Sequence, residues 1–165
     1  MIRFLDKEKE LHLLEQLFDL LYENMRTIAP SDLPYEEEKQ QWLSQVGPAM
    51  AKAPRQIVLI YDKERLAGYL QYYIRNNLFM VEEIQLRQDC RSTSLFAALW
   101  KFMTRIIPED VHFIEAYADP RNQASRRMME KLGMKIVEES SDAHFLHFRS
   151  SLNQNLLLSC FRTGK

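Results

Sequence analysis

Hydrophobic positions in the first third of the chain recur at helical spacing. After a short strand candidate at residues 1–5, leucine and aromatic residues return every three or four positions from residue 6 to about residue 25. This is the pattern of one buried face of an amphipathic helix. The polar, proline-containing segment 29–34 ends it. A second helix is predicted after this break, because Glu36, Glu37 and Glu38 are suited to a helix N-terminus and precede spaced apolar residues.

The centre of the chain has the pattern of an antiparallel meander. The segments IVLIY (57–61), LAGYLQYYI (66–74) and LFMVEEIQL (78–86) are apolar runs of strand length. Polar residues separate the first two runs. Asn76 and Asn77 separate the others, and asparagine tolerates the positive φ that a tight hairpin requires.

The second half of the chain alternates helical and strand patterns. A helix is predicted from residue 95 to 107, a strand over 111–118, a short helix ending at Gly133, and two final strands over 134–139 and 143–148. The order β-α-α-β-β-β-α-β-α-β-β predicts one α/β (α+β) domain spanning 1–165, with a mixed and mainly antiparallel sheet. The structure of residues 150–165 stays open.

Composition and charge exclude several classes of protein. The chain has 22 basic and 23 acidic residues, so its net charge of −1 gives no basis for binding nucleic acid. It has no apolar stretch of about 18 residues that could span a membrane, and its N-terminus does not resemble a secretory signal. Cys90 and Cys160 stand far apart, as free thiols of a reducing compartment do. We therefore expect a cytoplasmic protein.

No metal site is predicted. The two cysteines form no CxxC pair, and His144 and His147 are three positions apart in a predicted strand, where they would point to opposite faces. We interpret both histidines as structural residues.

Two local patterns resemble a known family. Residues 122–139, NQASRRMMEKLGMKIVEE, combine Asn122, Ser125 and the sequence EKLGM directly after a strand ending in YAD. Residues 81–102 combine a strand, Arg91 and a polar stretch that opens a helix. Both patterns resemble the Gcn5-related N-acetyltransferase (GNAT) family. The resemblance runs along nearly the whole chain and implies that family's fold.

The resemblance also implies an acetyl-CoA site. In this family, backbone N–H groups at a helix N-terminus bind the pyrophosphate, and glycines allow it to approach closely. Arg91 falls on the family's arginine position, and Ser94 and Phe96 fall on its two glycine positions. The implied cofactor-binding residues are Leu86, Arg91, Ser92, Thr93, Ser94, Leu95, Phe96, Asn122 and Arg126.

The glycine positions depart from the family pattern. The hydroxyls of Ser92, Thr93 and Ser94 are small and can donate to phosphate, or they can simply cap the helix. Phe96 places an aromatic ring where the cofactor would pass, unless the ring turns into the core. The capping-only reading and the reading with a phosphate site carry similar weight.

Candidate catalytic residues follow from the direct attack of an amine on a thioester. Glu82 and Glu83 alternate faces of one strand, so at most one can serve as the base. The resemblance implies that the backbone of Leu86 polarises the carbonyl. Met129 occupies the family's usual tyrosine position and cannot donate a proton, which leaves Tyr117 as the candidate acid.

Two functions remain open at this stage. The first is an N-acetyltransferase that uses acetyl-CoA to modify a small-molecule or peptide amine. The second is an inactive GNAT-fold binding or assembly domain, which Phe96 and Met129 favour. Unpaired sheet edges and the apolar LLLSCF tail leave room for a homodimer.

Overall fold

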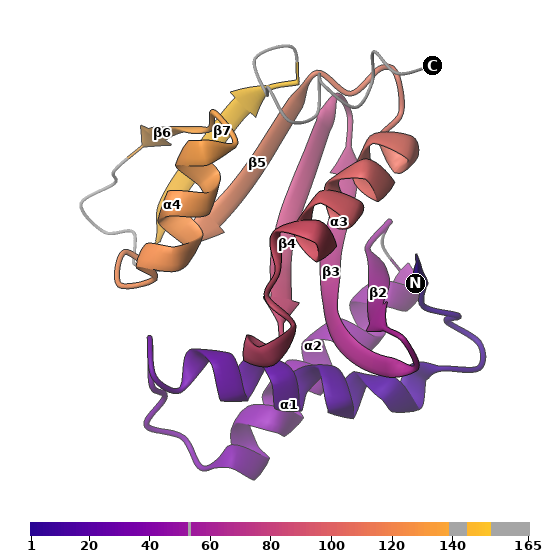
Figure 1. The fold of residues 1–165 in the computed structure, drawn as a ribbon. Helices are drawn as coiled ribbons and strands as arrows, with labels where there is room; N and C mark the ends of the chain where they lie inside the picture. Colours follow the sequence, from indigo (N-terminus) through magenta and orange to yellow (C-terminus); the bar gives the residue numbers. More distant parts are fainter. Residues whose placement is uncertain (53, 139–144, 153–165) are drawn as a thin grey trace. The chain divides into compact units, whose positions relative to one another are not determined.

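The computed structural model describes residues 1–52, 54–138 and 145–152, and its elements follow the predicted order (Figure 1). The helical elements are η1 (Leu11–Leu13), α1 (Leu14–Met25), α2 (Tyr35–Lys52), η2 (Gln88–Cys90), α3 (Thr93–Ile106) and α4 (Gln123–Lys131). The strands are β1 (Ile2–Phe4), β2 (Gln56–Asp62), β3 (Arg65–Arg75), β4 (Leu78–Leu86), β5 (Phe113–Ala118), β6 (Lys135–Glu138) and β7 (Leu146–Ser151).

The seven strands form one sheet in the order β1-β2-β3-β4-β5-β7-β6. Strands β4 and β5 pair in parallel, whereas β1 with β2, β2 with β3, β5 with β7 and β6 with β7 pair antiparallel. The predicted fold class, a mixed and mainly antiparallel α/β domain, is confirmed. The chain forms two compact units, which are residues 1–73 with 83–91, and residues 74–82 with the chain from residue 92 onward.

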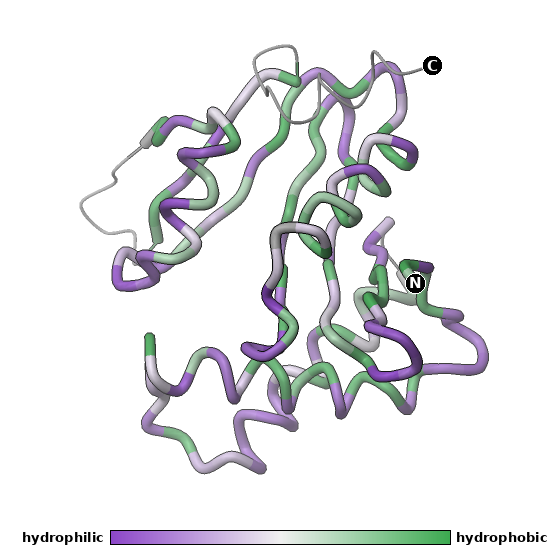
Figure 2. The backbone as a smooth tube through the Cα atoms, viewed as in Figure 1, coloured by the Kyte–Doolittle hydropathy of each residue, from purple (hydrophilic) through white to green (hydrophobic). Residues whose placement is uncertain are grey.

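In the first unit, α1 and α2 pack on the strands through their apolar faces. Their buried residues form one cluster with residues of β2 and β3. The members of this cluster include Leu17, Leu20, Val46, Met50, Ile57, Leu59 and Tyr69. Hydrophilic and hydrophobic positions alternate along α1 in Figure 2, as its predicted amphipathic pattern requires.

In the second unit, alternate residues of β5 and β7 divide into an apolar and a polar set. Ile114, Ala116 and Phe148 are buried, with at most 1 % of their surface exposed. Their neighbours along the strands, including Glu115 and His147, point to the opposite face. Helix α4 covers one face of these strands in Figure 1.

Backbone turns explain where several elements end. Asn76 adopts φ 54° between β3 and β4, and Gly133 adopts φ 74° after α4, so both predicted turn residues are confirmed. Helix α1 begins at Leu14 rather than near residue 6, because the Asp6 carboxylate accepts hydrogen bonds from the N–H groups of Glu8 and Lys9 and holds a turn there.

The last strand differs from its prediction. It was expected over 143–148, but β7 runs from Leu146 to Ser151. Residues 139–144 and the predicted apolar tail, including His144 and Cys160, lie outside the described residues. Of the helices in the described part of the chain, none is long and apolar enough to cross a bilayer.

Candidate active site

The end of strand β4 is held by side chains from two other segments. Asn24, near the end of α1 and only 5 % exposed, donates from Nδ2 to the carbonyl oxygen of Leu86 over 3.1 Å and to the side chain of Gln85 over 3.0 Å. Arg91 donates to the same Leu86 oxygen over 3.3 Å and to Asn24 Oδ1 over 2.9 Å. These contacts fix the backbone at the position expected to face the thioester.

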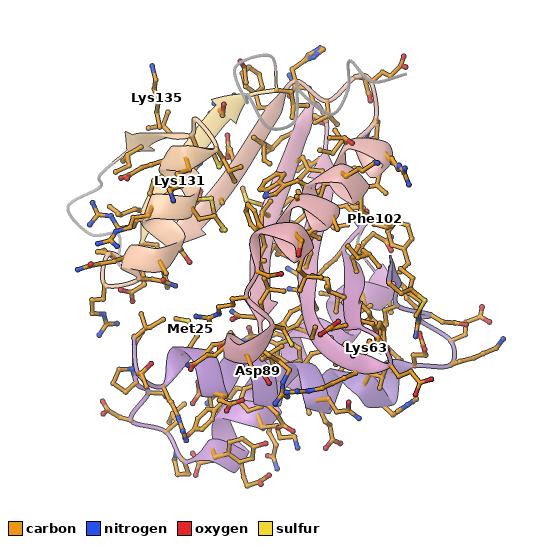
Figure 3. The ribbon with its side chains drawn as sticks, viewed as in Figure 1. Met25, Lys63, Asp89, Phe102, Lys131 and Lys135 are labelled. Atoms are coloured by element: carbon orange, nitrogen blue, oxygen red, sulfur yellow. The ribbon has the colours of Figure 1, made fainter. Side chains whose placement is uncertain are left out.

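Strand β3 reinforces this arrangement through a glycine. A Cβ atom at Gly68 would lie 2.2 Å from the carbonyl oxygen of Gln85 and 2.6 Å from the Leu86 side chain. Such distances leave no room for a side chain, so the close approach of β3 to the end of β4 requires glycine here. Arg65 at the start of β3 forms a 2.7 Å ion pair with Asp89. Asp89 lies in η2, directly after β4, and is labelled in Figure 3.

The two glutamates of β4 have different surroundings. Glu83 accepts hydrogen bonds from the Tyr69 hydroxyl and, over 3.3 Å, from Trp42 Nε1. Burial, followed by the nearby Glu83 charge, raises the pKa of Tyr69 well above its usual value, so this phenol stays protonated as a donor. Glu82 is half-buried and belongs to the second unit, whereas Glu83 belongs to the first.

Helix α3 begins at Thr93 and is capped by Ser92. The Ser92 hydroxyl accepts from the N–H of Leu95 over 3.2 Å, and its carbonyl accepts from the N–H of Phe96 over 3.1 Å. Ser94 is exposed, and its hydroxyl lies 3.1 Å from that of Ser92. The capping role of this serine cluster is therefore confirmed, while its phosphate-binding role stays a prediction.

The Phe96 ring packs along its own helix. It is half-buried and meets the ring of Trp100, one turn later, edge-on at 5.6 Å between centroids. Trp100 is itself only 1 % exposed. The aromatic ring at the second glycine position is thus directed toward a buried residue.

Helix α4 begins with an asparagine cap. Asn122 Oδ1 accepts from the N–H of Ser125 over 3.0 Å and so caps the helix. Arg126 is half-buried on the same helix. Met129 is 6 % exposed, so the residue at the usual tyrosine position is part of the core.

Tyr117 lies in a polar cluster that the sequence did not reveal. Its ring is 51 % exposed and stacks on His147 with centroids 4.6 Å apart and planes at 15°. Glu115, 7 % exposed, contacts His147 and Arg149. The sequence offered one clue, a single acidic residue inside the apolar strand HFIEAYA, but the register that pairs β5 with β7 could not be predicted.

In the described part of the chain, His, Cys, Asp and Glu residues form no group of three or more that could hold a metal ion.

Comparison with known proteins identifies one family. The model of the acetyltransferase (GNAT) family matches residues 14–134. No curated protein gives a significant sequence match. An acetyltransferase from Thermus thermophilus is similar in structure, with a TM-score of 0.71, 15 % identity, and 92 % of this chain and 96 % of that chain covered.

Two further solved structures are similar. The PaiA N-acetyltransferase from Thermoplasma acidophilum, in complex with coenzyme A, has a TM-score of 0.67 and 16 % identity over 92 % of this chain and 98 % of that one. An aminoglycoside 6′-acetyltransferase type Ii has a TM-score of 0.67 and 18 % identity over 92 % and 97 % of the two chains.

Proposed function

This chain belongs to the acetyltransferase (GNAT) family, and from that premise we propose that it transfers the acetyl group of acetyl-CoA to the amine of a small molecule or peptide. The reaction is a direct attack of the free amine on the thioester carbonyl. It needs a fixed donor for that carbonyl, an anion site for the cofactor, and a base for the ammonium proton.

The observation that carries the proposal is the fixed end of β4. Asn24 and Arg91 both hold the carbonyl oxygen of Leu86, and Gly68 allows β3 to approach closely. A backbone held in this way keeps its N–H groups oriented without reorganisation, which is what carbonyl polarisation requires. The proposed carbonyl donor is the backbone of Leu86.

The start of α3 suits the cofactor's phosphates. Its cap already occupies the N–H of Leu95, and the N–H of Phe96 makes the first helical hydrogen bond. Helix geometry therefore assigns the phosphate to the N–H groups of Thr93 and Ser94, together with the serine hydroxyls. The packing of Phe96 against Trp100 supports this assignment, because it directs the ring toward a buried side chain.

Further cofactor contacts are assigned to Arg91, Asn122 and Arg126, as the family pattern implies. The sequence offered two carboxylates of β4 as the base. Glu83 accepts hydrogen bonds from Trp42 and Tyr69, and Glu82 is the other candidate. Tyr117, exposed at the end of β5, is the candidate donor to the leaving thiolate.

A ligand-binding measurement tests the cofactor first. Acetyl-CoA, CoA and desulfo-CoA at a hundred times their dissociation constants should each stabilise the fold by about 2.7 kcal/mol, or several degrees in Tm. Ser94→Asp should raise the dissociation constant for acetyl-CoA at least about tenfold, because its carboxylate repels phosphate. Without ligand it should not lower Tm, because an acid favours a helix N-terminus. Ser94→Ala is the matched control.

The alternative function is an inactive binding or assembly domain. The burial of Met129 favours it, because the usual acid of the family is absent from α4. If Phe96→Gly with Met129→Tyr creates acetyl-CoA binding that the wild type lacks, the alternative gains. Turnover of acetyl-CoA by the wild type with any amine of a screening panel rules it out.

The proposal also includes location and assembly. Cys90 is a free cysteine, as in proteins of a reducing compartment, and we assign the chain to the cytoplasm on this pattern. A homodimer through a sheet edge is the proposed assembly, and sedimentation in solution tests it.

A further inference from the structure

A buried carboxylate on β5 orients a histidine on β7. Glu115 is 7 % exposed, and its Oε2 lies 2.9 Å from His147 Nε2. Its other oxygen, Oε1, lies 3.2 Å from Arg149 Nε. An ionised carboxylate only accepts hydrogen bonds, so the imidazole hydrogen is assigned to Nε2 and the lone pair to Nδ1.

The imidazole is held on a second side by an aromatic ring. Tyr117 stacks nearly parallel on His147 at 4.6 Å, while the His147 side chain keeps 18 % of its surface exposed. A ring that is fixed by a carboxylate and a stacking partner, yet remains accessible, is prepared for proton transfer. A histidine that only filled the core would lack this accessibility.

Tyr117 and His147 lie just beyond the last residues that pair between β4 and β5. The parallel register of β4 and β5 runs from Leu78 with Phe113 to Val81 with Ala116. Tyr117 is the next residue of β5, and its partner on β7 is His147. Glu82, one of the two sequence-based candidates for the base, is the next residue of β4.

We propose that His147, oriented by Glu115, removes the proton from the acceptor's ammonium group; this inference rests on the proposed acetyl transfer. The N–H bond breaks as Nδ1 gains the proton, and the free amine then forms the C–N bond while the C–S bond breaks. The acylated nitrogen then loses a second proton, which passes to the thiolate, and His147 returns its own proton to solvent, so that the products are the amide, CoA and one released proton. Glu115 is a positioning residue, because it acts only through the imidazole.

Within residues 54–138 and 145–152, the titratable groups near His147 come from β5, β6 and β7. Glu115 and Tyr117 face it from β5, and Arg149 neighbours it on β7 through their shared carboxylate. On β6, the backbone register places Glu138 opposite His147 and Lys135 opposite Arg149. Substitution of Arg149 therefore perturbs the same carboxylate without touching the imidazole.

The test uses two small acceptors with different protonation states. At neutral pH 1-butylamine is almost entirely ammonium, whereas hydroxylamine is mostly uncharged and needs no base. His147→Gln should lower acetyl transfer to 1-butylamine by about 10²-fold and transfer to hydroxylamine by less than about threefold. Raising the pH should restore part of the butylamine rate, because more free amine is then present. Glu115→Gln should also lower the butylamine rate more than the hydroxylamine rate, but by a smaller factor than His147→Gln.

Controls separate this inference from its rivals. Arg149→Gln keeps the Glu115 carboxylate beside the imidazole, so it should change the ratio of the two rates less than Glu115→Gln does, and Glu82→Gln should lower both rates by similar, small factors. The inference is overturned if His147→Gln lowers both rates equally, or if the selective loss appears in Glu82→Gln instead. Failure of the proposed function differs from either result, because the wild type would then acetylate neither acceptor.

Discussion

The side-chain amide of Asn24 donates to the backbone carbonyl of Leu86, 62 positions later in the chain, over 3.1 Å. The same side chain accepts from Arg91 through its oxygen. One buried amide therefore links the end of α1, the end of β4 and the residue that precedes the cap of α3. This link fixes the backbone on which the proposed reaction depends.

Asn24→Leu tests this link, because leucine keeps the branched shape of the side chain and removes every hydrogen bond. It should lower the free energy of unfolding by about 1–3 kcal/mol, because the polar partners of the amide lose their bonds. In an active enzyme, kcat should fall more than KM for acetyl-CoA rises. Urea unfolding and steady-state kinetics measure the two effects.

Asn24→Asp is the informative comparison. Aspartate keeps an acceptor for Arg91 but cannot donate to Leu86 or Gln85 while it is ionised. If it matched the wild type in stability and kcat, the donation to Leu86 would be irrelevant, and only the arginine contact would matter.

The close approach at Gly68 makes a second prediction. Gly68→Ala should lower stability by about 1–3 kcal/mol, because its Cβ would stand 2.2 Å from the carbonyl oxygen of Gln85 and backbone must move. Gly47→Ala on α2 is the control, since no atom lies within 4 Å of its added Cβ. Its effect should stay below about 1 kcal/mol, because the helical gain of alanine is offset by the restriction before Pro48.

Urea unfolding of the two alanine variants, with and without bound CoA, measures their free energies of unfolding and checks this prediction. Equal stability of Gly68→Ala and Gly47→Ala would show that the end of β4 yields easily to a methyl group. The proposed rigidity of Leu86 would then have to be abandoned.

The order of elements could be predicted because each element carries its own local signal. The apolar runs of β2, β3 and β4 have strand length, and Asn76 adopts the positive φ that its hairpin position predicted. Boundaries were less predictable where side chains compete with the helix. Asp6 bonds to nearby N–H groups and delays α1 to Leu14, which hydrophobic spacing alone could not reveal.

The candidate site was predictable only where its parts are contiguous in sequence. Ser92 and Asn122 precede helices and cap them, and for Ser92 this role was expected from its residue type. The Glu115–His147 pair joins residues 32 positions apart, and it depends on the β5–β7 register. The link from Asn24 to Leu86 depends in the same way on tertiary packing. Neither leaves a periodic pattern in the chain.

The cap of α3 makes a third prediction. Ser92→Ala should cost about 0.5–2 kcal/mol of stability, because Leu95 loses the hydroxyl that accepts its N–H. Ser92→Gly should cost only a few tenths, and Ser92→Asp should retain the cap. If the cap also orders the phosphate site, the alanine variant should bind acetyl-CoA more weakly in calorimetry. Loss of binding in Ser92→Asp alone would instead point to charge repulsion.

The ion pair between Arg3 and Glu10 makes the last prediction. Arg3 donates to both carboxylate oxygens over 2.7 Å and 2.6 Å, and this hydrogen bonding, followed by the N–H of Asp6, lowers the pKa of Glu10 from 4.5 to about 2. The folded state therefore binds the proton more weakly than the unfolded chain. Its extra stability is fully present above about pH 4.5 and is lost as the pH falls toward 2.

Glu10→Gln should therefore reduce stability by about 0.5–1 kcal/mol at pH 7, a range set by solvent screening of a partly exposed pair. The difference from the wild type should shrink between pH 4.5 and pH 2, and it should also shrink in high salt. Urea unfolding at several pH values measures both trends. Glu8→Gln removes the same charge from an exposed position nearby and reports the general effect of net charge. A difference between Glu10→Gln and wild type that stayed constant down to pH 2 would show that the carboxylate acts through packing, not through its charge.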